Sequence, residues 1–89
     1  NYLPCPNPAN VNLSEGKINF NVSTDLNIQT THFSIVNRKN EIVSGFSRDG
    51  NSFDDGYFYP NYGDDFTLYY IILTTDSCAF YGKGDIMID

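Results

Sequence analysis

The chain has 89 residues, of which 40% are hydrophobic, 16% aromatic and 18% charged. A disordered chain carries fewer aromatic side chains and more charge, so this composition indicates one small folded domain. Five basic residues against eleven acidic ones give a net charge of −6. That balance excludes nucleic-acid binding, which needs concentrated positive charge, and no apolar run reaches the roughly 20 residues of a membrane-spanning helix.

Residues 1–10 contain three of the four prolines and predict an extended, turn-rich leader. Pro6 keeps the backbone of Cys5 out of the helical region, as a pinned terminal segment would need. No charged stretch followed by an apolar stretch marks a signal peptide. Because the chain starts at Asn1 and not at Met, we expect a mature or trimmed product.

Alternating or continuously apolar residues predict short β-strands through the rest of the chain. The segments concerned are 17–23, 26–36, 41–46, 66–74, 77–82 and 84–88. Within the second segment the apolar positions change phase around Thr30 and Thr31. This change predicts a bulge, or two strand halves that meet different faces. Segment 66–74 is apolar on both faces and is expected to be the central strand.

Polar and glycine-rich stretches separate these segments and predict turns at 37–40, 76–77 and 82–84. Short strands with turns every 8–12 residues are typical of small sandwiches and barrels. We therefore expect residues 1–89 to form a single all-β domain. The expected architecture is a small antiparallel β-sandwich or partly open barrel of six to seven strands.

The two cysteines, Cys5 and Cys78, lie near opposite ends of the sequence. A disulfide between them would restrict the unfolded chain by roughly 4 kcal/mol in the chain-entropy model. It would staple the leader to the strand that follows the central one. Stable disulfides imply an oxidising compartment, so the pair predicts a secreted or extracellular protein.

Segment 47–65 is the one long stretch without strand periodicity, and it is rich in acidic and aromatic residues. Its acidic residues are Asp49, Asp54, Asp55, Asp64 and Asp65, and its aromatic residues are Phe53, Tyr57, Phe58, Tyr59 and Tyr62. Long loops in small domains are usually functional or mobile. Three interpretations of this loop stay open.

In the first interpretation the loop binds calcium, because hard cations prefer clustered carboxylate and carbonyl oxygens. Asp49, Asn51, Asp54 and Asp55 are the candidate ligands, although the spacing departs from an EF-hand. In the second interpretation the loop is a contact surface, since Tyr beside Asp, Asn and Gly suits recognition of a protein or glycan. In the third, its aromatic residues cover the core edge while the Asp side chains remain in water.

Evidence for catalysis is weak. His32 is the only histidine and falls inside a predicted strand, so we expect it on a strand surface or satisfied by a neighbour. No nucleophile-elbow motif is present, and zinc chemistry lacks a second histidine and a free thiol. Adjacent carboxylates such as Asp54–Asp55 and Asp64–Asp65 point apart, unlike the facing pair of a glycosidase. We expect no enzyme activity and no cofactor, with calcium as the one alternative left open.

The Cys5–Pro6 start, the strand-rich middle and the late Cys78-Ala79-Phe80-Tyr81 support a family comparison. Together they resemble small exported domains of unknown function from Legionella-like bacteria, in which an early Cys-Pro pairs with a late Cys followed closely by Tyr. The resemblance spans the chain length. It implies export through the periplasm, with type II secretion as one route, and a role in virulence through host or surface contact.

The sequence therefore predicts a secreted, non-enzymatic binding module. Its contact surface would be formed by Tyr57, Tyr59, Tyr62, Asp54, Asp55, Asp64 and Asp65. Two alternatives are a structural module of the cell surface that pairs through an exposed strand edge, and a calcium-stabilised domain.

Overall fold

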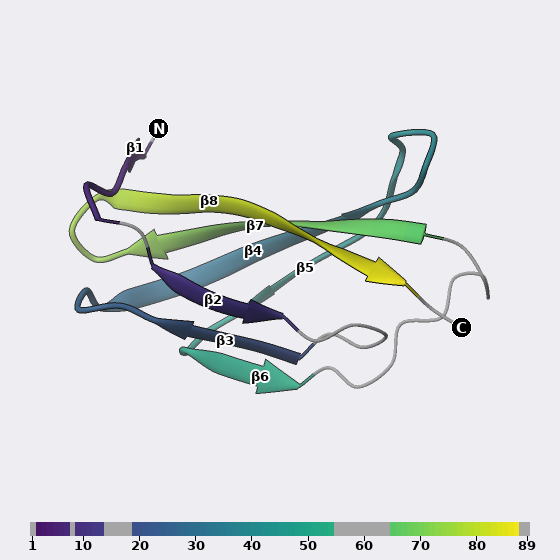
Figure 1. Cartoon of the computed structure of the whole chain (residues 1–89). Coiled ribbons are helices and arrows are strands. Elements are labelled where there is room, and N and C mark those ends of the chain that lie inside the picture. The colour runs from purple at the N-terminus through teal and green to yellow at the C-terminus, as the bar shows by residue number, and fades with distance from the viewer. Residues whose placement is uncertain (1, 8, 14–18, 55–64, 88–89) are drawn as a thin grey trace.

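A computed structural model of the chain describes residues 2–7, 9–13, 19–54 and 65–87. These residues form two β-sheets that pack against each other (Figure 1). The sheets contain seven strands of three or more residues and one two-residue strand. The strands are β1 (Leu3–Pro4), β2 (Asn10–Leu13), β3 (Asn19–Ser23), β4 (Ile28–Val36), β5 (Ile42–Arg48), β6 (Ser52–Asp54), β7 (Asp65–Thr74) and β8 (Cys78–Met87).

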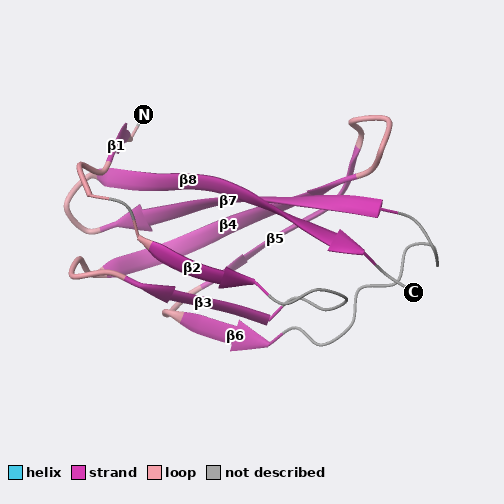
Figure 2. Ribbon diagram, viewed as in Figure 1, coloured by secondary structure: helices cyan, strands magenta, loops and turns pink. Residues whose placement is uncertain are grey.

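The larger sheet has the order β1-β8-β7-β4-β5 and the smaller one the order β2-β3-β6. Every pairing is antiparallel except that of β1 with β8, where Leu3 lies opposite Cys78. The all-β prediction is confirmed, and the two sheets form an open sandwich (Figure 2). The described residues contain no helix of the length and apolarity needed to cross a membrane.

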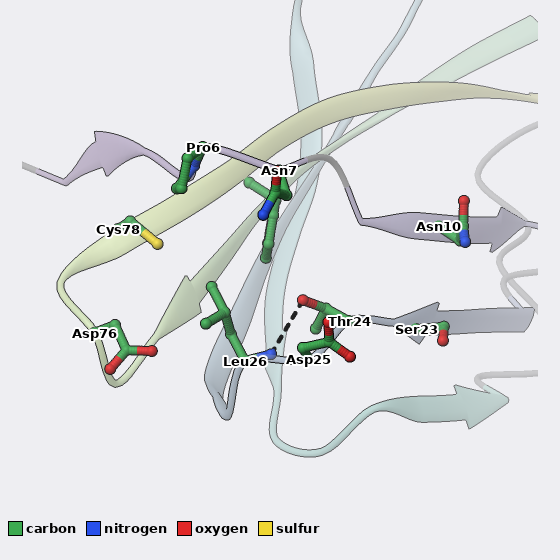
Figure 3. A pocket seen from close by; sticks show the side chains of 10 residues that line it. Pro6, Asn7, Asn10, Ser23, Thr24, Asp25, Leu26, Asp76 and Cys78 are labelled. Atoms are coloured by element: carbon green, nitrogen blue, oxygen red, sulfur yellow. Dashed lines mark hydrogen bonds between the residues drawn. The ribbon is translucent and has the colours of Figure 1, made fainter.

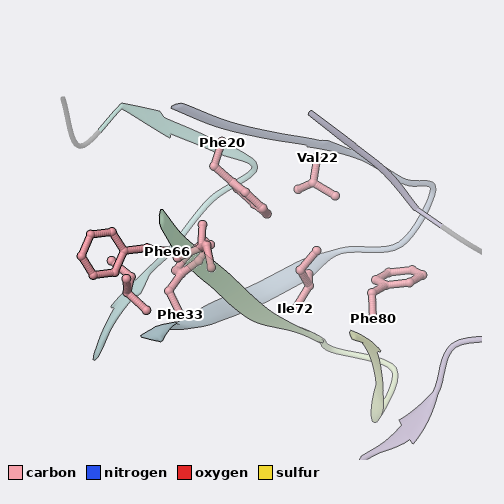
Figure 4. Packing of buried hydrophobic residues seen from close by; sticks show 8 residues of the cluster. Phe20, Val22, Phe33, Phe66, Ile72 and Phe80 are labelled. Carbon is pink, nitrogen blue, oxygen red and sulfur yellow. The ribbon is translucent and has the colours of Figure 1, made fainter. Parts of the chain in front are cut away.

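The hydrophobic core lies between the sheets and draws on both of them. Alternation places Phe20 and Val22 of β3 on the inner face, where both are almost fully buried. They point toward Phe33 and Ile72 of the larger sheet (Figure 4). The rings of Phe20 and Phe33 meet edge to face at 4.9 Å between centroids, a favoured aromatic geometry. The small sheet therefore covers a core to which the large sheet contributes most of the side chains.

Strand β7 is central in the larger sheet, as its sequence predicts, but only one of its faces is buried. Phe66, Leu68 and Ile72 point into the core, whereas Tyr69 and Ile71 on the other face remain about 40% and 38% exposed. An antiparallel sheet can leave one face in water, so apolar residues on both faces do not require a cover on both.

The phase change predicted around Thr30 and Thr31 is confirmed as a register shift between β4 and β7. The shift falls between Ile28 and Thr30, after which Thr31, Phe33 and Ile35 take the inner face. The predicted turn at 37–40 is also present, because the Asn37 side-chain oxygen accepts hydrogen bonds from the amides of Lys39 and Glu41.

Two sequence expectations about local structure were wrong. The turn predicted at 82–84 does not form, because β8 continues through it in register with β7 as far as Met87. Segment 47–65 is not a single loop, since it contains the end of β5 and all of β6. Gly50, with a φ of 94°, makes the tight connection between these two strands and carries the chain from one sheet to the other.

The predicted disulfide is present and ties the leader to the large sheet. Cys5 and Cys78 are bonded, and the Cys5 amide donates a hydrogen bond to the carbonyl of Ala79 at 3.0 Å. The disulfide lies at one end of the sandwich. Strand β6 ends and β7 begins at the other end of the sandwich (Figure 1).

Candidate functional site

Most of the predicted contact residues lie outside the described part of the chain. This applies to Tyr57, Tyr59, Tyr62, Asp55 and Asp64, whose proposed role stays a prediction. Asp54 is described only as the last backbone position of β6. Asp65 is the one member with a described side chain. It opens β7, is exposed, and has the same strand parity as Tyr69 and Ile71, so it belongs to the outer face of the large sheet.

The calcium candidates are only partly described. Asp49 and Asn51 are exposed and flank Gly50 in the connection from β5 to β6. The side chain of Asp54 and all of Asp55 fall outside the described residues. Within the part that the structure describes, no three His, Cys, Asp or Glu side chains are grouped so that they could hold a metal ion. Calcium binding by segment 47–65 therefore stays a prediction.

The outer face of the large sheet carries a group of exposed apolar side chains that are not among the predicted site residues. We call Tyr69, Ile71 and Tyr81 the tyrosine face; their exposed fractions are 40%, 38% and 53%. Ile71 of β7 lies directly opposite Tyr81 of β8, and Tyr69 lies opposite Lys83, two residues further along β8. Side chains at such direct and diagonal positions are close enough to act as one surface.

Tyr81 is held in place by the leader. Its hydroxyl donates a hydrogen bond of 2.7 Å to the backbone carbonyl of Tyr2. The leader is fixed in turn by the pairing of β1 with β8 and by the Cys5–Cys78 disulfide. An exposed aromatic ring is thereby restrained without being buried, which lowers the entropy that a binding partner would have to remove.

His32 continues the tyrosine face across the sheet and is placed on a strand surface, as expected. It lies opposite Ile71 on one side and Ser47 on the other. Its Nδ1 atom is 2.6 Å from the Ser47 hydroxyl oxygen, and both side chains are exposed. Nucleophilic catalysis by such a pair needs a third group to orient the imidazole and a site shielded from water. The contacts described around His32 are those of a cross-strand surface pair.

The tyrosine face could have been anticipated from one feature of the sequence. Segment 66–74 is apolar on both faces, and an antiparallel strand in a chain of this size has enough partners to bury only one of them. The excess apolar residues on the second face were therefore a signal of an exposed patch. No such signal marked Tyr81, because it comes to lie beside Ile71 only through the pairing of β8 with β7.

No protein-family model, curated protein or solved structure matches this chain. The similarity to exported Legionella-like domains thus stays a prediction from two short motifs.

Proposed function

We propose that this protein is a secreted, non-enzymatic binding module whose contact surface is the tyrosine face. The exposure of Tyr69, Ile71 and Tyr81 side by side on the large sheet carries the proposal. Single exposed apolar residues are ordinary on a protein surface, whereas contiguous ones mark interaction sites. The partner is a host or cell-surface protein, and a glycan is the second ligand class that tyrosine rings suit.

The chemistry of tyrosine supports this role. A tyrosine ring offers a large apolar area with few rotatable bonds, and tyrosines are enriched among the residues that dominate binding energies. Tyr81 is already restrained through Tyr2, so binding costs less conformational entropy there. Lys83, opposite Tyr69, supplies a charged group at the rim. Such a surface fits a partner with an apolar centre and polar surroundings.

The tyrosine face shares its side of the large sheet with Asp65, the one residue of the expected surface whose side chain is described. Asp65 lies on the same outer face of β7, at the end where segment 55–64 joins the strand. Tyr57, Tyr59 and Tyr62 therefore remain part of the proposed surface, on the grounds of their sequence. A partner that covers Tyr69 and extends toward Asp65 would reach the attachment point of that segment.

The proposed secreted location rests on the disulfide. A bond that closes most of the chain persists in the bacterial periplasm or outside the cell and is rare in the cytosol. The resemblance to exported Legionella-like domains points the same way and suggests a type II secretion substrate with a role in virulence. The exposed His32–Ser47 pair, lacking a third orienting group among its described contacts, supports a binding role over a catalytic one.

A screen against host-protein and glycan arrays tests the proposal. We expect the wild-type protein to capture a partner and the Tyr69→Ser/Tyr81→Ser variant to lose at least about tenfold in affinity, as for residues at the centre of an interface. Ile42→Ser is the matched control, because Ile42 is an exposed apolar residue near the β4–β5 turn. Circular dichroism confirms folding of each variant.

A Tyr59→Ala/Tyr62→Ala variant separates the two parts of the surface. If this variant loses binding and the Tyr69→Ser/Tyr81→Ser variant does not, the contact surface is segment 55–64 and the assignment to the tyrosine face is wrong. Unchanged binding in both double variants would overturn the whole contact surface. Running the screen with and without calcium also tests the calcium-stabilised alternative.

A second candidate function is assembly through a strand edge. Strand β5 is the last strand of the large sheet, and its Ile42 and Val43 are 71% and 42% exposed. An open edge can pair with a strand of another chain. The register shift opposite Ile35 and Val36 interrupts this edge and opposes such pairing. Light scattering at high concentration tests it: a dimer that Val43→Lys dissolves would support assembly, and a monomer would refute it.

A further inference from the structure

A cavity of about 470 Å³ opens at the disulfide end of the sandwich. It lies between the leader at Pro6 and Asn7, the β3–β4 turn, and the β7–β8 turn (Figure 3). Its volume is within the range of small-molecule sites in proteins. The cavity is at the opposite end of the sandwich from the first residues of β7, and its lining does not include the tyrosine face.

The floor of the cavity is apolar. Leu26 is half-buried there, Phe80 is only 8% exposed, and Cys78 of the disulfide also lines the wall. Leu26 projects between the leader and the β7–β8 turn (Figure 3). Because the Phe80 ring belongs to the core, it offers no open face on which a sugar ring could stack. The floor instead suits a flexible aliphatic chain.

The formal charges on the cavity wall are all negative. Asp25 lies on the β3–β4 turn and Asp76 on the β7–β8 turn, and both are exposed. The described lining includes no Lys, Arg or His. The two carboxylates flank Leu26 from different turns (Figure 3). This arrangement repels anions and complements a ligand with separated positive charges.

Hydrogen bonds fix both turns before any ligand arrives. The Leu26 amide donates to the Thr24 hydroxyl oxygen at 3.3 Å, and the Asp76 amide donates to the Thr74 hydroxyl oxygen at the same distance. The two turns are also linked, because the Thr75 amide donates to the Asn27 carbonyl at 3.0 Å. Asp25 and Asp76 thus lie on two turns that are already held in place and joined to each other by hydrogen bonds. Binding therefore has to remove less conformational entropy.

We propose that this cavity binds an aliphatic polyamine. Its methylene chain would lie on Leu26 and touch the small exposed part of Phe80, and its ammonium groups would be placed beside Asp25 and Asp76. Asn7, whose side chain points into the cavity, can accept a further N–H through its amide oxygen (Figure 3). This site goes beyond the proposed contact surface, and its test requires no protein or glycan partner.

Calorimetric titration with spermidine at low ionic strength provides the test. We expect binding that Asp25→Asn and Asp76→Asn each weaken by about fivefold, the change that corresponds to one exposed charge pair. Asp85→Asn is the matched control, because it removes the same charge from an exposed position on β8, away from the cavity. The Asp85→Asn variant should change the affinity for spermidine by less than about twofold, because a carboxylate far from the cavity attracts the ligand only weakly. Pentylamine, with one ammonium group, should bind more weakly than spermidine.

A spectroscopic measurement locates the ligand. In NMR titrations, spermidine should shift the amide signals of Thr24 and Leu26 and the ring signals of Phe80, and should leave those of β5 unchanged. The proposal is wrong if no binding is detected with spermidine at concentrations up to about 10 mM, because any weaker affinity would be too low to be useful. Equal weakening by Asp85→Asn, or shifts spread over the surface, would also overturn it in favour of nonspecific charge attraction.

Discussion

The ring of Tyr70 on β7 lies over Gly82 on β8, directly opposite in the register of the two strands. A Cβ atom added at Gly82 would fall on the Tyr70 ring. The same ring contacts Phe20 of the smaller sheet edge to face, at 5.6 Å between centroids. The absence of a side chain at Gly82 therefore allows an aromatic residue of the central strand to contact both sheets.

We expect Gly82→Ala to lower the free energy of unfolding by about 1–3 kcal/mol, because the added methyl group overpacks the site. Gly45→Ala is the matched control. A Cβ there would meet only the carbonyl of Phe33 at 3.5 Å, which is an ordinary contact. Urea unfolding measures both variants. The explanation fails if the two glycine substitutions have equal effects, or if Tyr70→Val does not relieve the cost of Gly82→Ala.

Burial raises the pKa of the Tyr70 phenol above its ordinary value of 10.0. The folded state then holds this proton more tightly than the unfolded state does. The corresponding stability is complete below about pH 10 and is lost as pH rises through the raised pKa. We expect the unfolding free energy of the wild type to fall more steeply above about pH 10 than that of Tyr70→Phe. Parallel curves for the two proteins would show that Tyr70 does not contribute.

Two buried threonines are expected to respond in opposite ways to loss of their hydroxyl group. Both Thr31 and Thr74 are 1% exposed. The Thr31 hydroxyl has no hydrogen-bond partner among the described residues, whereas that of Thr74 donates to the Cys78 carbonyl at 2.8 Å. We expect Thr31→Val to raise the unfolding free energy by about 1 kcal/mol and Thr74→Val to lower it by about 1–3 kcal/mol. Thermal or urea unfolding gives both values, and destabilisation by Thr31→Val would indicate a partner such as a buried water.

Loss of the disulfide should free the leader without unfolding the sandwich at room temperature. We expect the Cys5→Ser/Cys78→Ser variant to lose about 4 kcal/mol of stability, as for closure of a long loop. In this variant, hydrogen exchange should become fast at the amide of residue 5, which in the wild type donates to the Ala79 carbonyl, and stay slow in the centre of β4 and β7. Two reactive thiols in the native protein would contradict both the disulfide and the secreted location.

How far the sequence predicts this fold depends on how each strand is specified. Strands β3, β4 and β7 carry their own alternation, so their positions and the bulge near Thr30 can be predicted locally. Strands β2 and β6 are only four and three residues long, with the sequences NVNL and SFD, so neither carries a long run of alternation. They form because β3 lies between them, and pairing of that kind leaves little trace in local sequence.

The same distinction applies to the candidate sites. Glycines at 82 and 84 resemble a turn locally, yet Gly82 is a strand residue because Tyr70 occupies the space of its side chain. The disulfide could be predicted, since only two cysteines are available. The cavity beside it could not, because Asp25, Asp76 and Asn7 are brought together by three turns far apart in sequence.

The disulfide also determines how the domain responds to a pulling force. Strand β8 runs from Cys78 toward the carboxyl end, so tension between Leu3 and Met87 passes through the Cys5–Cys78 bond and along β8. The strands between the two cysteines lie outside this path and are not extended. Reduction of the bond would bring them into the path and release about 250 Å of chain at full extension. The oxidised protein is therefore a nearly inextensible link that one chemical event can lengthen.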